Sequence, residues 1–232
     1  HRDLHSFPTR RSSDLLSLDV SRWQGRVDWD KVKASGLVSG VMLKTVSTNR
    51  KLSKRKDGLY IDPTFEHNYA ECKRVGLPVG VYYYTYATDK EMADAELALL
   101  KTALTGKTFE LPICVDVEDN KLRKLGKQAL TDLTAYALAT IEQWGFYALL
   151  YTGLNFGETR LYMGGAALRK YDVWVAAYRD DKPTPAWSFG MWQYTSTASV
   201  PGVIGNVDLS HAYKNYAKII AKKGLTRLRE GA

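Results

Sequence analysis

The chain has 232 residues, of which 45% are hydrophobic and 25% are charged, and its formal net charge at pH 7 is +8. This composition excludes a disordered chain and supplies one core of ordinary size, and no run approaches the roughly 20 apolar residues that a membrane helix needs. The positive charge favours a polyanionic partner. It does not distinguish nucleic acid from a wall polymer rich in carboxylates and phosphates.

The first fifteen residues, HRDLHSFPTRRSSDL, do not share the pattern of the rest of the chain. They begin with His1 rather than Met, are mostly polar and follow neither the helical nor the strand period. Since they resemble translated cloning or adapter sequence, we expect residues 1–15 to be a non-native leader. No signal peptide is visible, so localisation is inferred from chemistry alone.

Eight short runs rich in Val, Ile, Tyr and Trp follow and are predicted to be strands. They span residues 16–20, 40–46, 78–86, 110–118, 146–153, 173–178, 189–195 and 206–210. Segments with helical periodicity occupy 28–35, 62–75, 89–104 and 131–144, and a closing helix is expected near 213–220. The later gaps contain KPTPAWS and STASVPGVIG, which are too rich in Pro, Gly and Ser for a packed helix.

Strands that alternate with helices predict an α/β fold. We expect a modified TIM-like barrel, with about five β/α units followed by three β strands, over residues 16–220. An open doubly wound sheet is the alternative. Residues 221–232 are expected to be a tail or the stub of a linker.

Metal and cofactor chemistry is not expected. The two cysteines, Cys72 and Cys114, lie in a helical stretch and an apolar strand and are predicted to be buried free thiols. The four histidines are scattered and have no metal-ligand spacing.

Four carboxylates are associated with predicted strand ends. Asp19 ends the first strand, Asp116 and Glu118 end the fourth, and Asp208 lies in the last. In a closed barrel the first and last strands are neighbours, so we expect Asp19 and Asp208 side by side, facing the other two acids. Taken singly, Asp19 and Asp208 could equally be turn or helix caps.

Asp116 and Glu118 are separated by one residue, Val117. In a strand this spacing predicts that both side chains point to the same face, roughly 6.6 Å apart. Repulsion between two such acids should raise the pKa of one of them. That acid then serves as proton donor while its partner stays charged, as glycoside hydrolysis requires.

Aromatic rings gather near the same strand ends, where they can pack on the flat faces of sugars. We expect Tyr84, Tyr151 and Trp192 in a cleft, together with Trp174 and the amide of Gln193. Alternation along the strand sends Tyr82 and Tyr83 to opposite faces, so part of the aromatic set belongs to the core.

Several motifs, in order along the chain, resemble the glycoside hydrolase family 25 lysozymes, the Chalaropsis-type N-acetylmuramidases. The motifs are LDVS (18–21) with WQG (23–25) and VDW (27–29), DPTF (62–65) with NY (68–69), GLPVGVY (76–82), LP to DVE (111–118), WVAAY (174–178), WQY (192–194) and GNVDL (205–209). The likeness covers about residues 16–220.

This resemblance implies hydrolysis of the β-1,4 bond between N-acetylmuramic acid and N-acetylglucosamine. It also implies that Glu118 is the proton donor, Asp116 its acidic partner, and Asp19 and Asp208 flanking acids. After the second strand, many members have Lys-Ala-Thr-Glu-Gly, whereas this chain has Lys44 followed by TVST. The usual acidic residue and glycine are therefore absent. Lys44 is expected to bind substrate, and the basic insertion over 50–56 is expected to replace the subsite near this loop.

The expected partner is bacterial peptidoglycan outside the cell or in the wall, with anionic wall polymers as a second partner. Neither nucleic acid nor a membrane is expected, and the enzyme should act as a monomer. The competing interpretations are a chitinase-like hexosaminidase and a wall-binding module without catalysis. The presence of all four acids disfavours the module.

Overall fold

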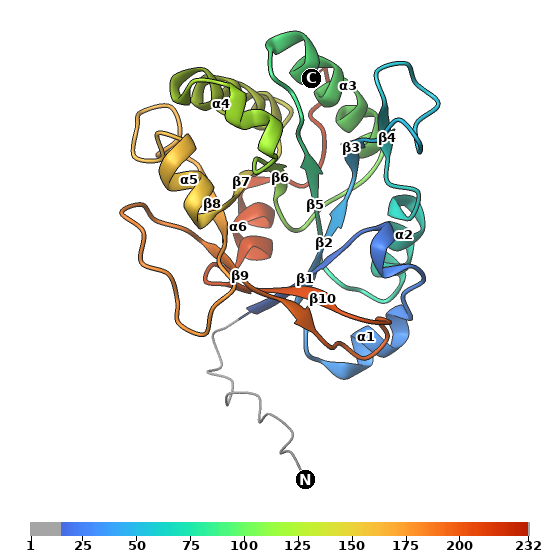
Figure 1. Cartoon of the computed structure of the whole chain (residues 1–232). Helices are drawn as coiled ribbons and strands as arrows, with labels where there is room; N and C mark the ends of the chain where they lie inside the picture. Colours follow the sequence, from blue (N-terminus) through green and yellow to red (C-terminus); the bar gives the residue numbers. More distant parts are fainter. Residues whose placement is uncertain (1–14, 232) are drawn as a thin grey trace.

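The computed structural model describes residues 15–231, and eight of its strands form one closed barrel (Figure 1). The barrel order is β1-β10-β9-β8-β7-β6-β5-β2, which confirms the predicted barrel and excludes the open sheet. Its strands are β1 (Leu15–Val20), β2 (Gly40–Lys44), β5 (Val79–Tyr84), β6 (Ile113–Asp116), β7 (Ala148–Gly153), β8 (Asp172–Ala176), β9 (Met191–Ala198) and β10 (Val207–Ala212).

β10 is antiparallel to both of its neighbours, whereas the other barrel strands pair in parallel. Only residues 199–206 connect β9 to β10, which is too short for the crossover of a dozen or more residues that a parallel return needs. As a result, Asp208 lies near the start of the last strand rather than at its end. The reversed direction still pairs Asp208 with Asp19 at the same mouth of the barrel, as expected.

A two-stranded antiparallel sheet, β3 (Val46–Thr48) and β4 (Leu59–Ile61), was not predicted. It follows β2 directly, and the Thr45 hydroxyl between β2 and β3 donates a hydrogen bond to the Tyr82 carbonyl at 2.8 Å. The predicted strand 40–46 is therefore two strands, and the basic segment lies at the tip of a hairpin.

Five helices surround the barrel and a sixth closes one end of it (Figure 1). They are α1 (Trp29–Ser35), α2 (Phe65–Arg74), α3 (Lys90–Leu104), α4 (Lys127–Gln143), α5 (Leu154–Arg160) and α6 (Tyr216–Lys223), with short 3-10 turns η1 (Arg22–Gln24) and η2 (Asn120–Lys124). Asp28 and Asp89 cap α1 and α3 by accepting from backbone amides, so the predicted starts at these residues are confirmed. The short α5 was not predicted, and α4 begins four residues before its predicted start at Thr131.

Alternation along the strands produces two cores. Tyr83 points outward into the layer between barrel and helices, while Tyr82 points into the barrel and packs on Trp174. Cys72 belongs to the outer layer and Cys114 to the interior, and both are buried free thiols as predicted.

Helix α6 closes the end of the barrel where the parallel strands begin. Tyr216 and Ile220 insert into the interior core, and the Tyr216 hydroxyl donates to Asp172 Oδ2 at 2.7 Å. Lys214 forms an ion pair with the same carboxylate at 2.9 Å. Because this end is filled, the opposite mouth is where a ligand can approach the interior-facing side chains.

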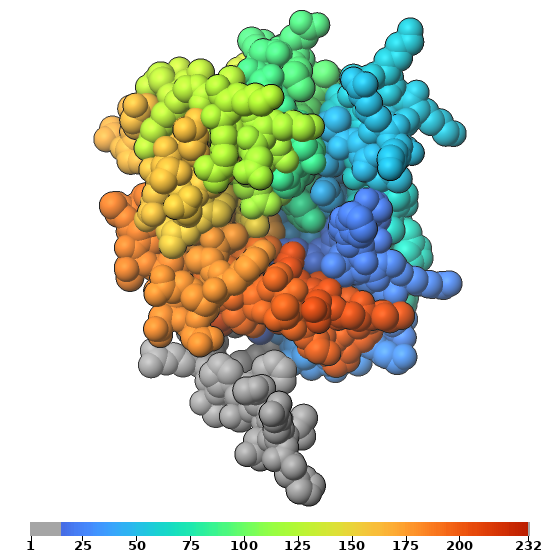
Figure 2. All heavy atoms as spheres, in the orientation of Figure 1, coloured from blue at the N-terminus to red at the C-terminus, as the bar shows by residue number. Residues whose placement is uncertain are grey.

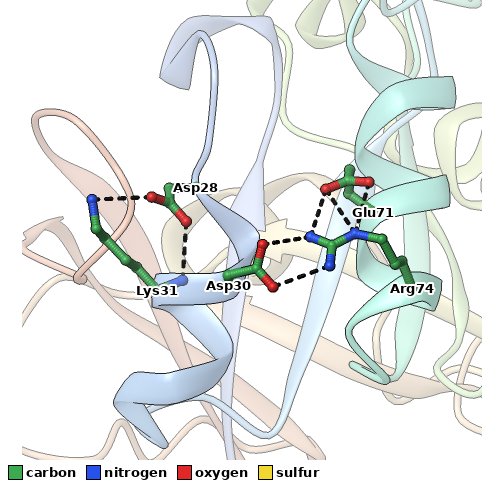
Figure 3. Close-up of polar contacts among 5 residues, drawn as sticks. All are labelled: Asp28, Asp30, Lys31, Glu71 and Arg74. Carbon is green, nitrogen blue, oxygen red and sulfur yellow. Dashed lines mark hydrogen bonds and ion pairs between the residues drawn. The ribbon is translucent and has the colours of Figure 1, made fainter.

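Arg74 of α2 links two helices on the surface (Figure 3). Its guanidinium pairs with Asp30 of α1 at 2.6 Å and with Glu71 of α2 at 2.9 Å. All three side chains are substantially exposed, so this network contributes little to stability and mainly sets the packing of α1 against α2.

The segment beyond residue 220 contacts the domain. The Thr226 carbonyl accepts from the Phe109 amide at 2.8 Å, and the Arg229 amide donates to the Trp144 carbonyl at 2.9 Å. Leu228 packs on the outer core. The leader expected over 1–15 lies outside the described residues except for Leu15, which begins β1 and pairs with Ala212. Within residues 15–231, no helix is both long enough and apolar enough to cross a membrane.

Candidate active site

The four predicted acids meet at the open mouth of the barrel. Asp19 and Asp208 are register partners on β1 and β10, and the Asp208 charge helps burial to raise the pKa of Asp19. Asp116 ends β6, and its pKa is raised by burial first and by the Glu118 charge second. Glu118 lies two residues beyond the end of β6, so the predicted strand separation of these two acids does not apply.

Burial differs among these acids and determines how each can act. Asp19 and Asp116 are each 4% exposed, and within residues 15–231 no partner hydrogen-bonds Oδ1 of either carboxyl. Glu118 is only partly buried, and its pKa is raised by burial and opposed by the positive charge of Lys44. All of these shifts favour protonated carboxyls, which are the form that can donate a proton.

Lys44 is the cation of the site. It ends β2, and its Nζ lies 5.1 Å from the ring centroid of Tyr84 and 5.9 Å from that of Tyr82. Burial lowers the pKa of Lys44, and the charges of Asp116 and Asp62 oppose that shift. Lys44 therefore supplies a partly desolvated positive charge next to the Asp116 and Glu118 pair.

Gln193 on β9 connects the acids to the aromatic side chains. Its Nε2 donates to Asp19 Oδ2 at 2.7 Å, and its Oε1 accepts from the hydroxyls of Tyr151 at 2.9 Å and Tyr178 at 3.0 Å. Gln193 is 3% exposed, so these three bonds fix the amide and hold Asp19 in place.

Tyr151 and Trp174 form the floor beneath the acids rather than an open platform. Their ring centroids are 4.8 Å apart, and the Trp174 indole donates to the Ser210 hydroxyl at 2.9 Å. Trp174 is 1% exposed and Tyr151 is 7% exposed. Tyr84 is more accessible, and its hydroxyl donates to Asp119 at 3.1 Å.

Trp192 does not lie with the other predicted cleft residues. It is adjacent to Gln193 on β9, and alternation places it on the outer face of the barrel. There its indole donates to the Ala177 carbonyl at 2.8 Å and its ring stacks on His211. The side chain is 4% exposed, so the prediction that Trp192 lines the cleft is wrong.

Three residues near the acids were not among the predicted site residues. Tyr178 is 59% exposed as a residue, and its pKa is raised first by partial burial and then by the charges of Asp208, Glu118 and Asp19. Tyr178 ends the WVAAY motif, directly after a predicted strand, and this position could have indicated that it lies at the site. Asp62 was predicted only as a helix start, and Asp119 was given no role. Both lie in loops, whose sequences have no periodicity that could place them at the site.

An open cavity of about 480 Å³ adjoins Glu118. It is bounded by Glu118, Arg123, Tyr178 and Arg179, and by the start of α5. A larger hollow of about 700 Å³ lies between α4, α5 and residues 161–167, and it contains none of the four acids. Because only the smaller of these two cavities is lined by one of the four acids, it is the candidate site for a proton-transfer reaction.

Glu96 of α3 supports the aromatic rim of the site from behind. Its carboxylate accepts from the Thr85 hydroxyl at 2.6 Å and from the Tyr86 amide at 2.9 Å. The Tyr86 ring in turn lies 5.0 Å from that of Tyr84. Burial raises the pKa of Glu96 to about 7, although these hydrogen bonds oppose the shift.

Replacing Glu96 with glutamine should remove part of the pH dependence of stability. The folded chain holds the Glu96 proton to higher pH than the unfolded chain. The protonated carboxyl therefore contributes its full stabilisation of the fold below pH 4.5, and this contribution is lost as the pH rises through about 7. The stability of the wild type relative to Glu96→Gln should therefore fall by up to about 3 kcal/mol across that window. Urea unfolding at pH 4 to 8 measures the difference. Glu91→Gln, at an exposed position of the same helix, is the control, and identical pH dependence in all three proteins would contradict the role of Glu96.

The sequence and the fold of this chain match those of a known family of glycoside hydrolases. Residues 18–203 match the family described as Glycosyl hydrolases family 25. The chain is 29% identical over 216 residues to the uncharacterized protein YegX of Escherichia coli K12, with 90% of this chain and 74% of that protein covered. It is 25% identical over 232 residues to Lysozyme M1 of Streptomyces globisporus, with 90% and 71% covered.

Among solved structures, the bacterial lysozyme from Streptomyces coelicolor superposes with a TM-score of 0.74 at 25% identity. The match covers 91% of this chain and 97% of that one. The family match extends from the strand that carries Asp19 almost to the one that carries Asp208, and the barrel is shared. This chain belongs to glycosyl hydrolases family 25.

Proposed function

We propose that this chain is an N-acetylmuramidase, which hydrolyses the β-1,4 bond between N-acetylmuramic acid and N-acetylglucosamine in bacterial peptidoglycan. The observation that carries the assignment of roles is the position of Glu118. Among the four acids of the described site, Glu118 alone lines the open cavity, and its raised pKa keeps a proton available. Glu118 donates that proton to the oxygen of the leaving sugar.

Asp116 is the acidic partner in this proposal. In the free enzyme, deeper burial favours the proton on Asp116 over Glu118. An acetamido N–H of the substrate that donates to the free Oδ1 of Asp116 stabilises the ionised form and leaves the proton on Glu118. The same contact orients the acetamido oxygen for attack on the anomeric carbon, as in substrate-assisted hydrolases. Asp19 and Asp208 flank this position.

The sugar-binding side chains are those that remain accessible at the mouth. Tyr84 and Tyr178 present rings and hydroxyls, and Lys44 presents a cation. Gln193 holds the Tyr178 hydroxyl in place. Tyr151 and Trp174 act as the rigid floor. Since one chain supplies every one of these groups, the enzyme acts as a monomer, and it works where its polymer is, outside the cell as a secreted or released lysin.

Analysis of the products tests this function. Purified peptidoglycan is digested and reduced with borohydride, and the new ends are identified by mass spectrometry, which should find reduced N-acetylmuramic acid. Proton NMR should show the β-anomer first, because acetamido participation retains configuration. Reduced N-acetylglucosamine ends, binding without release, or activity on chitin alone would each contradict the muramidase assignment, and an initial α-anomer would contradict retention.

A further inference from the structure

The β3–β4 hairpin carries a concentrated positive charge at its tip. Residues 49–58 read NRKLSKRKDG, and all five basic side chains among them are exposed. The tip is held by its own hydrogen bonds, since the Asn49 carbonyl accepts from the amides of Leu52 and Ser53 and the Asn49 amide donates to the Gly58 carbonyl. This segment, here called the basic tip, is therefore an ordered projection that presents cations to solvent.

In the part of the chain that the structure describes, most of these cations form no ion pair with an acid. Arg55 forms an ion pair with Asp57 at 2.6 Å. Within residues 15–231, no carboxylate forms an ion pair with Arg50, Lys51, Lys54 or Lys56. By contrast, Arg74 on α2 is matched by two acids. The charge of the basic tip is therefore free to attract an external anion.

The basic tip is connected to the active-site mouth. β3 begins two residues after Lys44, and the Ser47 hydroxyl hydrogen-bonds Tyr86, whose ring lies beside that of Tyr84. Figures 1 and 2 show the hairpin standing out at the edge of the molecule, next to α2 and α3. These contacts place the base of the hairpin on the Tyr84 side of the mouth.

We propose that the basic tip binds the phosphodiester groups of anionic polymers attached to the glycan strand near the bond that is cut. This rests on the muramidase function and names a further feature of its substrate. Separate lysine ammonium groups suit phosphates spaced along a flexible chain, because each acts as a point charge without a fixed fork geometry. Residues 49–58 contain no aromatic ring on which bases could stack, which disfavours single-stranded nucleic acid.

The test compares two sets of lysines on two wall preparations. Lys51, Lys54 and Lys56 are replaced together by glutamine in one variant. The control variant replaces Lys218, Lys222 and Lys223, three exposed lysines on α6 at the opposite end of the barrel, so both variants lose the same charge. Binding is measured by sedimentation with wall that keeps its phosphate polymers and with wall stripped of them by acid, at low and high salt.

The variant of the basic tip should bind intact wall roughly tenfold more weakly than the wild type at low salt, since each exposed ion pair contributes a modest factor. The deficit should disappear in high salt and on stripped wall. The α6 variant should bind like the wild type. Equal weakening of both variants, or undiminished binding by the variant of the basic tip, would overturn the proposal.

Release of reducing ends from stripped wall separates this proposal from the function on which it rests. All three proteins should release them at the same rate, because the basic tip contains no group of the catalytic site. If none of the three releases ends, the muramidase assignment fails, whatever the binding data show. If all three release ends equally but intact wall does not distinguish them, only the role of the basic tip is overturned.

Discussion

Replacement of Glu118 with glutamine should lower turnover on peptidoglycan by roughly 10²–10⁴-fold, the usual contribution of a positioned general acid. The amide has nearly the same shape as the carboxylic acid but cannot give up a proton to the leaving sugar. Because Glu118 is only partly buried and lies beyond the end of β6, the substitution should leave the fold intact. Release of reducing ends under substrate saturation gives the turnover, and thermal unfolding checks the fold.

A matched substitution controls for the loss of one carboxylate. Glu158 lies at an exposed position on α5, and Glu158→Gln removes the same charge without touching the four acids. Its turnover should be that of the wild type. If Glu118→Gln kept turnover within about twofold of the wild type, the proton donor would have to be another acid, and Asp208 would be the next one to replace.

The barrel and its register were predictable because they follow from short-range rules. Alternation separated Tyr82 from Tyr83, and closure of the barrel brought Asp19 beside Asp208, although these residues are far apart in the sequence. Periodicity does not encode the direction of a strand, so the reversal of β10 was not predicted, although the short 199–206 connection is a signal for it. The β3–β4 hairpin was missed because its strands have only three residues each.

The acids were easier to predict than the residues around them. Each acid stands next to an apolar strand, where a carboxylate is conspicuous. Trp192 and Gln193 were both expected in the cleft, yet neighbours on a strand face opposite ways, and the structure places Gln193 inside and Trp192 outside. Asp62 and Asp119 reach the site through loops, whose paths depend on contacts such as that of the Tyr84 hydroxyl with Asp119.

Asp116→Asn should also cripple the enzyme, by roughly 10²–10³-fold in turnover, because it removes a charge that stabilises the developing positive charge of the transition state. It should also change the pH profile of kcat/KM. In the wild type the two limbs report the two ionisations of the coupled Asp116 and Glu118 pair, so the acidic limb should disappear when Asp116 is replaced. The remaining basic limb then reports Glu118 alone and should lie at lower pH, because the repulsion between the two carboxylates is gone.

Stability distinguishes a catalytic role for Asp116 from a structural one. Burial raises the pKa of Asp116 well above its usual range, so the ionised carboxylate destabilises the folded chain. A neutral amide at this position removes that destabilisation. Asp116→Asn should therefore unfold at the same urea concentration as the wild type or a higher one at pH 7, despite its loss of activity. A carboxylate kept for the fold would behave in the opposite way, with lower stability and an unchanged pH profile in the variant. That result would make Asp116 a structural residue and return the choice of acidic partner to Asp19 and Asp208, which share the same mouth of the barrel.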